Sequence, residues 1–135
     1  MVVSISFSVN FGVGLNIHGH IEPFVMVNFE VGKIDILAKA GFIFDKTGVA
    51  VLVPGVFISG DFENFRPHGG FEGFWHLQEN QCLFLGKIGV DYGINVKFAE
   101  LYLGLDIGIP INLPGDFFVS GLSNPIPMLT AYLEF

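Results

Sequence analysis

Residues 3–17 read VSISFSVNFGVGLNI, and this stretch is the strongest indicator of the fold class. Apolar side chains occupy every odd position from Val3 to Ile17, whereas serine, asparagine and glycine occupy the even positions. Only an extended strand places alternate residues on opposite faces, because an α-helix repeats about every 3.6 residues. The stretch therefore predicts one long β-strand with an apolar face and a polar face.

The same alternation recurs along most of the chain. Residues 84–98 and 101–111 keep apolar side chains on one parity and glycine, lysine, aspartate or asparagine on the other. Residues 33–44 follow the pattern, and residues 21–31 carry a weaker copy of it. No segment has a convincing helical period, so we expect one all-β domain over residues 1–135. Residues 59–82 are the least regular, and we expect the longest loop there, with a short strand near residues 71–77.

The composition excludes several classes of protein. Hydrophobic residues make up 51% of the 135 residues and charged residues 14%, against about 25% charged residues in an ordinary soluble domain. Six Lys and Arg residues face 13 Asp and Glu residues, and the net charge of -7 argues against nucleic acid as a partner. Cys82 is the single cysteine, so no disulfide framework can form within the chain, and no base is arranged beside it for catalysis. We expect no catalytic residue.

The polar face of the strands distinguishes two architectures that share this alternation, the soluble sandwich and the membrane barrel. In a sandwich the polar face meets bulk water, whereas in a narrow barrel it points inward, where charges need partners. Here the polar positions hold mostly serine, glycine and asparagine with scattered opposite charges. We expect a closed lumen that pairs the following charged residues: Glu30, Lys33, Asp35, Lys39, Lys87, Asp91, Lys97 and Asp106.

The end of the chain carries a resemblance to a known class. Phe135 is preceded at alternate positions by Leu133, Ala131 and Leu129, and this resembles the terminal strand of small bacterial outer-membrane β-barrels. Eight bilayer-spanning strands of roughly 9–11 residues also fit within the chain. The resemblance implies an antiparallel up-and-down β-barrel of about eight strands in the outer membrane, with the lipid bilayer as partner and a structural or pore-like, non-enzymatic role. Trp75 would then be an interface aromatic.

Other features favour a soluble alternative. Three prolines lie inside expected strands, where each needs a bulge or a strand end: Pro23, Pro54 and Pro110. Residues 49–58 are apolar on both faces, and Phe24 and Met26 occupy polar positions. The alternative is an antiparallel β-sandwich or jelly roll, cytoplasmic or secreted, that binds a ligand or forms part of an assembly. It would be a homo-oligomer, because its surplus apolar surface must be covered.

A candidate metal site lies at one strand connection. His18, His20 and Glu22 are two residues apart, so in an extended segment they share one face and could bind a transition metal. The first two belong to a set that resembles part of the first motif of cupins, without its glutamate: Gly12, His18, His20 and Gly32. The other interpretation is a polar connection between two strands. No other cofactor is expected.

Overall fold

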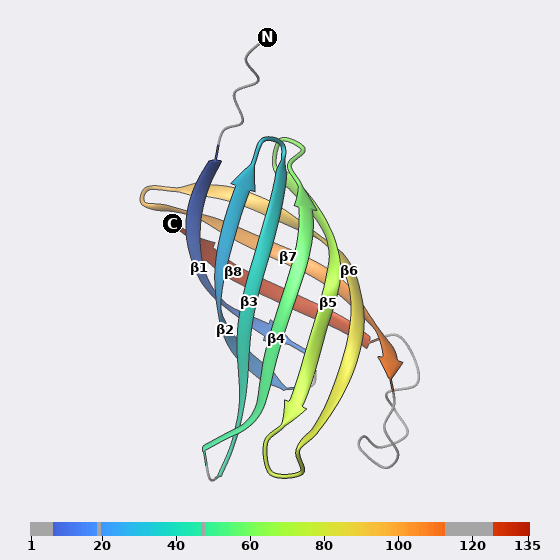
Figure 1. The fold of residues 1–135 in the computed structure, drawn as a ribbon. Helices are drawn as coiled ribbons and strands as arrows, with labels where there is room; N and C mark the ends of the chain where they lie inside the picture. Colours follow the sequence, from blue (N-terminus) through green and yellow to red (C-terminus); the bar gives the residue numbers. More distant parts are fainter. Residues whose placement is uncertain (1–6, 19, 47, 113–125) are drawn as a thin grey trace.

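The computed structural model describes residues 7–18, 20–46, 48–112 and 126–135. Its eight strands are β1 (Phe7–Ile17), β2 (Ile21–Val31), β3 (Ile34–Asp45), β4 (Gly48–Gly60), β5 (Phe65–His76), β6 (Gln81–Val96), β7 (Ala99–Asn112) and β8 (Ile126–Glu134). Each strand pairs antiparallel with the next, and β1 also pairs with β8, so the sheet closes into a barrel (Figure 1). The predicted up-and-down barrel is therefore confirmed, and the sandwich and jelly-roll alternatives are wrong. Among the described residues, no helix is long and apolar enough to cross a membrane.

The alternation of the sequence decides which side of the wall each side chain takes. Val90 and Leu103 point outward and are 42% and 49% exposed. Their chain neighbours Asp91 and Tyr102 are buried inside the barrel. Large apolar side chains thus lie on the outer surface and the charged ones inside, as the sequence predicts for a barrel. Residues 3–6 of the opening stretch lie outside the described residues.

Short turns connect strands at the barrel end where β1 begins and β8 ends (Figure 1). Gly32 and Lys33 form the turn between β2 and β3, and Gly32 has a φ of 65°, which glycine adopts without the steric cost of a Cβ. Lys97 lies in the turn between β6 and β7. Both lysines are exposed, so their predicted place among the lumen charges is wrong. Alternation assigns a residue to a face but does not mark where its strand ends.

The region expected to be the longest loop is mostly strand. β5 occupies residues 65–76 and pairs with β4 and β6, so the predicted loop over 59–82 and the short strand near 71–77 were wrong in extent. The outward-facing positions of β5 include Pro67, Gly69 and Gly73 among its aromatic residues. These three residues interrupt the run of apolar side chains on the outer face, and the sequence of β5 therefore resembles a loop.

Each of the three prolines expected to interrupt a strand lies beside an irregular or missing stretch of strand pairing. Pro110 lies at a register shift between β6 and β7. Pro23 lies before the pairing of β2 with β3 begins, and Pro54 lies in a gap of the pairing between β4 and β5. Because proline has no N–H to donate, these are the places where it interferes least with the sheet.

Two apolar clusters fill part of the interior. The first consists of Val51, Val53, Phe74, Leu83, Leu85 and Met128. The second consists of Phe24, Met26, Leu37, Phe57, Tyr102 and Tyr132. Phe24 and Met26, which are apolar residues at positions expected to be polar, therefore face inward in the second cluster. Segment 49–58, which is apolar at both sets of alternate positions, contributes residues to both clusters. The interior therefore combines packed apolar layers with charged groups.

Candidate functional site

The interior of the barrel holds an unusual number of buried charges. Six carboxylates are buried: Glu22, Asp35, Glu72, Asp91, Asp106 and Glu134. Three basic side chains are buried with them: Lys39, Arg66 and Lys87. The side chains of His18 and His68 are also only 6% and 7% exposed. A buried charge is tolerated only when it is paired and hydrogen-bonded, so the contacts of these groups determine the stability of the interior.

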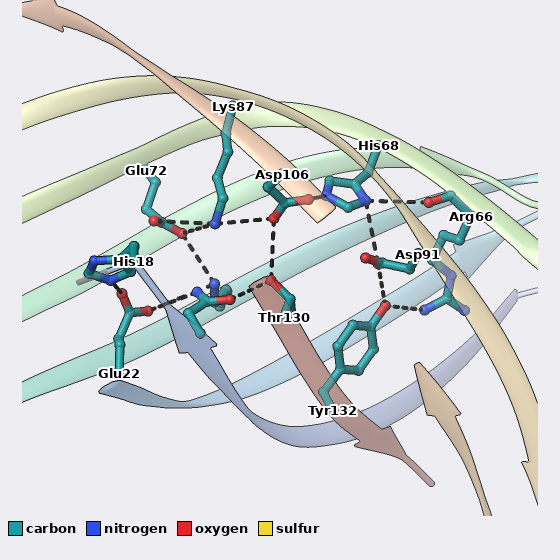
Figure 2. Close-up of polar contacts among 12 residues, drawn as sticks. His18, Glu22, Arg66, His68, Glu72, Lys87, Asp91, Asp106, Thr130 and Tyr132 are labelled. Atoms are coloured by element: carbon teal, nitrogen blue, oxygen red, sulfur yellow. Dashed lines mark hydrogen bonds and ion pairs between the residues drawn. The ribbon is translucent and has the colours of Figure 1, made fainter. Parts of the chain in front are cut away.

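One half of this charge network gathers around Glu72 (Figure 2). Its Oε2 lies 3.3 Å from Nζ of Lys39 and 3.4 Å from Nζ of Lys87. Lys39 also lies 3.8 Å from Oε2 of Glu22, and Oε1 of Glu22 lies 2.9 Å from Nε2 of His18. Lys39 is therefore held between two glutamates, from β2 and β5, and Glu72 is shared by both lysines.

Asp106 joins this half to a second group of residues. Its Oδ2 lies 3.3 Å from Nζ of Lys87, and its Oδ1 lies 2.7 Å from Nε2 of His68. The other ring nitrogen of His68, Nδ1, lies 3.4 Å from Oδ2 of Asp91. His68 is thus placed between two aspartates from β6 and β7.

Arg66 extends the network toward the C-terminal end of β8. The hydroxyl of Tyr132 donates to Asp91 over 2.7 Å, and Nη1 of Arg66 donates to that hydroxyl over 3.2 Å. The same Nη1 lies 2.6 Å from Glu134, and Nη2 lies 3.6 Å from Asp35. Polar contacts therefore run without a break through the interior from His18 to Arg66 (Figure 2). The ion pair between Arg66 and Glu134 continues them to the end of β8.

Each of the three buried cations also lies over an aromatic ring. Nζ of Lys39 is 4.2 Å from the centroid of Phe24, and Nζ of Lys87 is 5.6 Å from that of Phe57. Cζ of Arg66 is 4.1 Å from the centroid of Tyr102. A ring face attracts a cation, and more strongly when water is absent. The aromatic residues of the second cluster therefore stabilise the charges as well as the packing.

Glycines give the carboxylates the space they occupy. Asp91 pairs across β6 and β7 with Gly104, and Asp106 pairs with Gly89. A Cβ at either glycine would coincide with Oδ1 of the aspartate opposite, and a Cβ at Gly41 would coincide with Glu22 in the same way. These glycines are therefore required for the space they leave above the backbone.

The interior contains little free volume. A cavity of about 30 Å³ lies among the charged residues and the second apolar cluster. A larger hollow of about 450 Å³ opens at the end where β8 finishes, and five carboxylates line it: Glu30, Asp61, Glu63, Glu100 and Glu134. Arg66 and the stacked rings of Tyr102 and Tyr132, with centroids 4.9 Å apart, lie between the two spaces.

The structure brings together five of the eight predicted lumen charges: Asp35, Lys39, Lys87, Asp91 and Asp106. Glu30 is half-buried and accepts hydrogen bonds from Ser8 and Asn10, outside the main network. Sequence reasoning missed the network residues Arg66, His68, Glu72 and Glu134. In β5 a signal was present, because Arg66, His68 and Glu72 all lie at even positions. The aromatic residues Phe65, Phe71 and Trp75 lie at odd positions.

The other predicted site residues lie at the opposite end of the barrel from Glu134. His18 contacts Glu22, but His20 is exposed, and its ring centroid is 6.4 Å from that of His18. Trp75 is 42% exposed at the end of β5, and its Nε1 donates to Asn80 over 3.2 Å. Glu22 thus belongs to the charge network, whereas His20 stands apart from it.

Replacing Tyr132 with phenylalanine tests the continuity of the network. The variant removes the donor to Asp91 and the acceptor for Arg66, both of which are buried. We expect the free energy of unfolding to fall by about 1–3 kcal/mol, the cost of leaving a buried acceptor unsatisfied. Urea denaturation followed by tryptophan fluorescence measures the change. Tyr92→Phe, at an exposed position, is the control, and an equal loss in both variants would contradict the role of Tyr132.

Comparisons with known proteins support the fold and leave the family open. No protein-family model matches the chain, and no curated protein sequence matches it. Among solved structures, the chain is similar to the N-terminal β-barrel domain of OprF from Pseudomonas aeruginosa. The two share 10% sequence identity at a TM-score of 0.66, and the similarity covers 98% of this chain and 100% of that domain. This chain therefore has the same fold as that β-barrel domain.

Proposed function

We propose that the chain is a β-barrel of the bacterial outer membrane with a structural, non-enzymatic role and a closed interior. The distribution of side chains carries this proposal, because charged groups are inside the barrel and apolar ones outside. Each of these outward side chains is at least two-fifths exposed: Phe11, Ile36, Val56, Phe71, Ile88, Leu105 and Ile109. An apolar surface of this extent requires a covering, and lipid acyl chains provide one.

The dimensions of the wall support the same proposal. The eight strands contain between 9 and 16 residues, and a tilted bilayer-spanning strand needs about 9–11. Outer-membrane barrels of this type have an even number of antiparallel strands, beginning at about eight. Aromatic side chains lie near both ends of the wall, with Trp75 at one end and the edge-to-face pair of Phe65 and Tyr92 at the other. Such side chains are typical of the membrane–water interfaces.

The closed interior favours a structural role over an open channel. The cavity of about 30 Å³ has room for about two water molecules, at 10–15 Å³ each. Arg66, Tyr102 and Tyr132 separate it from the larger hollow. Barrels of about eight strands are generally filled by their own side chains. We therefore expect no ion conductance from the reconstituted protein.

Placing an arginine on the outer surface tests the membrane proposal. Leu105 lies near the middle of β7 and is 62% exposed, whereas Ile34 begins β3 beside a turn and is 54% exposed. We expect Leu105→Arg to lower the free energy of unfolding in lipid vesicles by about 2 kcal/mol, and Ile34→Arg by less than 1 kcal/mol. Chemical denaturation of both variants in vesicles gives the comparison. Equal effects of both arginines would contradict a bilayer around the barrel.

Extraction provides an independent test. We expect the protein to require detergent, and its electrophoretic mobility to change on heating because the barrel unfolds only then. A monodisperse, detergent-free homo-oligomer would instead support a soluble assembly whose apolar faces cover one another. Conductance in planar bilayers would overturn the closed interior while leaving membrane insertion intact.

A further inference from the structure

The geometry points to a binding site for a divalent transition metal inside the barrel, formed by His68, Asp91 and Asp106. These residues come from three neighbouring strands, β5, β6 and β7. One ligand atom from each lies within 4.8 Å of the others. An imidazole with two carboxylates is a donor set that suits zinc and related ions. The site lies in the interior and does not depend on what surrounds the barrel.

The two carboxylates are oriented by groups that would stay outside the coordination sphere. Oδ2 of Asp106 contacts Lys87 and accepts from Thr130, and Oδ2 of Asp91 accepts from Tyr132. Hydrogen bonds from such outer residues fix the direction of metal ligands. The remaining oxygen of Asp91, Oδ1, is buried and has no hydrogen-bond partner. Since an unpaired buried carboxylate oxygen is costly, this atom is a vacant acceptor for a cation.

The surroundings provide space for an ion. All three side chains line the interior cavity of about 30 Å³, together with Lys39, Lys87, Thr130 and Tyr132. An ion there needs no opening of the wall.

The charge of the interior favours an additional cation. Among the described residues, six buried carboxylates face three buried basic side chains, and Asp91 forms an ion pair with His68. A metal ion beside Asp91 would offset part of this excess of negative charge.

The two ring nitrogens of His68 both face hydrogen-bond acceptors. Nε2 lies 2.7 Å from Asp106, and Nδ1 lies 3.3 Å from the carbonyl oxygen of Arg66. Both partners are acceptors, so in the metal-free site each ring nitrogen is placed to donate a proton to one of them. Phe57 packs against the same ring from β4. When a metal ion binds, one ring nitrogen gives its proton to solvent and donates its electron pair to the ion. One M²⁺ therefore replaces one H⁺ in the site.

Cobalt is a direct probe for this site, because Co²⁺ in a protein site of low coordination number absorbs visible light. The folded protein in detergent is treated with a chelator and then titrated with Co²⁺. We expect one Co²⁺ per chain, displacement by Zn²⁺, and release of one proton per ion measured with a pH indicator. Affinity is expected to fall as the pH is lowered, because proton and metal compete for His68.

Matched variants locate the ion. His68→Gln and Asp91→Asn are each expected to weaken Co²⁺ binding about a hundredfold, whereas His20→Gln, at an exposed histidine, is expected to change nothing. Circular dichroism verifies that each variant keeps its β-structure. Failure of the wild type to bind Co²⁺ would overturn the proposal, and so would binding that persists in His68→Gln but is lost in His18→Gln. If the interior variants do not fold, binding without proton release in the wild type would overturn it equally.

Discussion

Replacing Lys87 with leucine is expected to lower the free energy of unfolding by about 3–5 kcal/mol. Nζ of Lys87 lies 3.4 Å from Glu72 and 3.3 Å from Asp106, and all three side chains are buried. Without the lysine, Asp106 retains His68 and Glu72 retains only Lys39 as a cationic partner. Breaking a buried pair by removing one partner is costly, because the other charge remains in a medium of low dielectric constant.

Lys46→Leu is the matched control, since Lys46 is an exposed residue at the turn between β3 and β4. Urea denaturation of both variants in the same detergent gives the two midpoints. The loss in Lys87→Leu is expected to shrink at acidic pH, where a protonated carboxyl group no longer needs the lysine. Equal midpoints for the two variants at neutral pH would show that the interior charges do not depend on one another.

Replacing Gly70 with alanine is expected to cost about 3 kcal/mol, the upper part of the usual range for overpacking. Gly70 faces the interior, and a Cβ there would coincide with the carbonyl oxygen of Val56 and lie against Phe57. Both obstacles involve backbone atoms of β4, so no side-chain rotation can relieve them. The strands β4 and β5 would have to separate, which breaks their ladder between Glu72 and His68.

Gly69→Ala provides the control from the adjacent position. The nearest atoms to a Cβ at Gly69 would be a methyl group of Ile88 at 3.6 Å and the oxygen of Lys87 at 3.7 Å, both ordinary contacts. Alanine there is expected to be neutral or slightly stabilising, because glycine in a strand has a larger entropy to lose on folding. Heat-induced unfolding of the two variants compares neighbouring residues on opposite faces of one strand. A similar loss in both would contradict the inward orientation of Gly70.

The sequence predicts the barrel wall well because period-two alternation is a local property. Residues 84–98 and 101–111 have one interpretation each, and the faces that this alternation assigns to Val90, Asp91 and Leu103 are those observed. Strand ends are less predictable. Lys33 and Lys97 share the parity of the interior residues, but both lie in turns, where a side chain can reach water.

The composition of the interior site could not be predicted, since it depends on how far each strand is shifted along its neighbour. Glu22 and Glu72 are 50 positions apart in the sequence, yet both contact Lys39. No local pattern contains that information. In β5, glycine and proline on the outer face weakened the alternation, so Arg66, His68 and Glu72 were not assigned to a strand although they share one set of alternate positions.

The pairing of β1 with β8 also determines when the barrel can close during biosynthesis. Thr130 donates to Asn16 over 2.6 Å, although the two residues are 114 positions apart. They cannot meet before residues 126–134 have left the ribosome, so the ring stays open throughout translation of the first seven strands. During that time β1 and the most recently formed strand expose unpaired backbone groups and apolar outer faces, a combination that is prone to aggregation. Ring closure is therefore expected to be the slow step of folding.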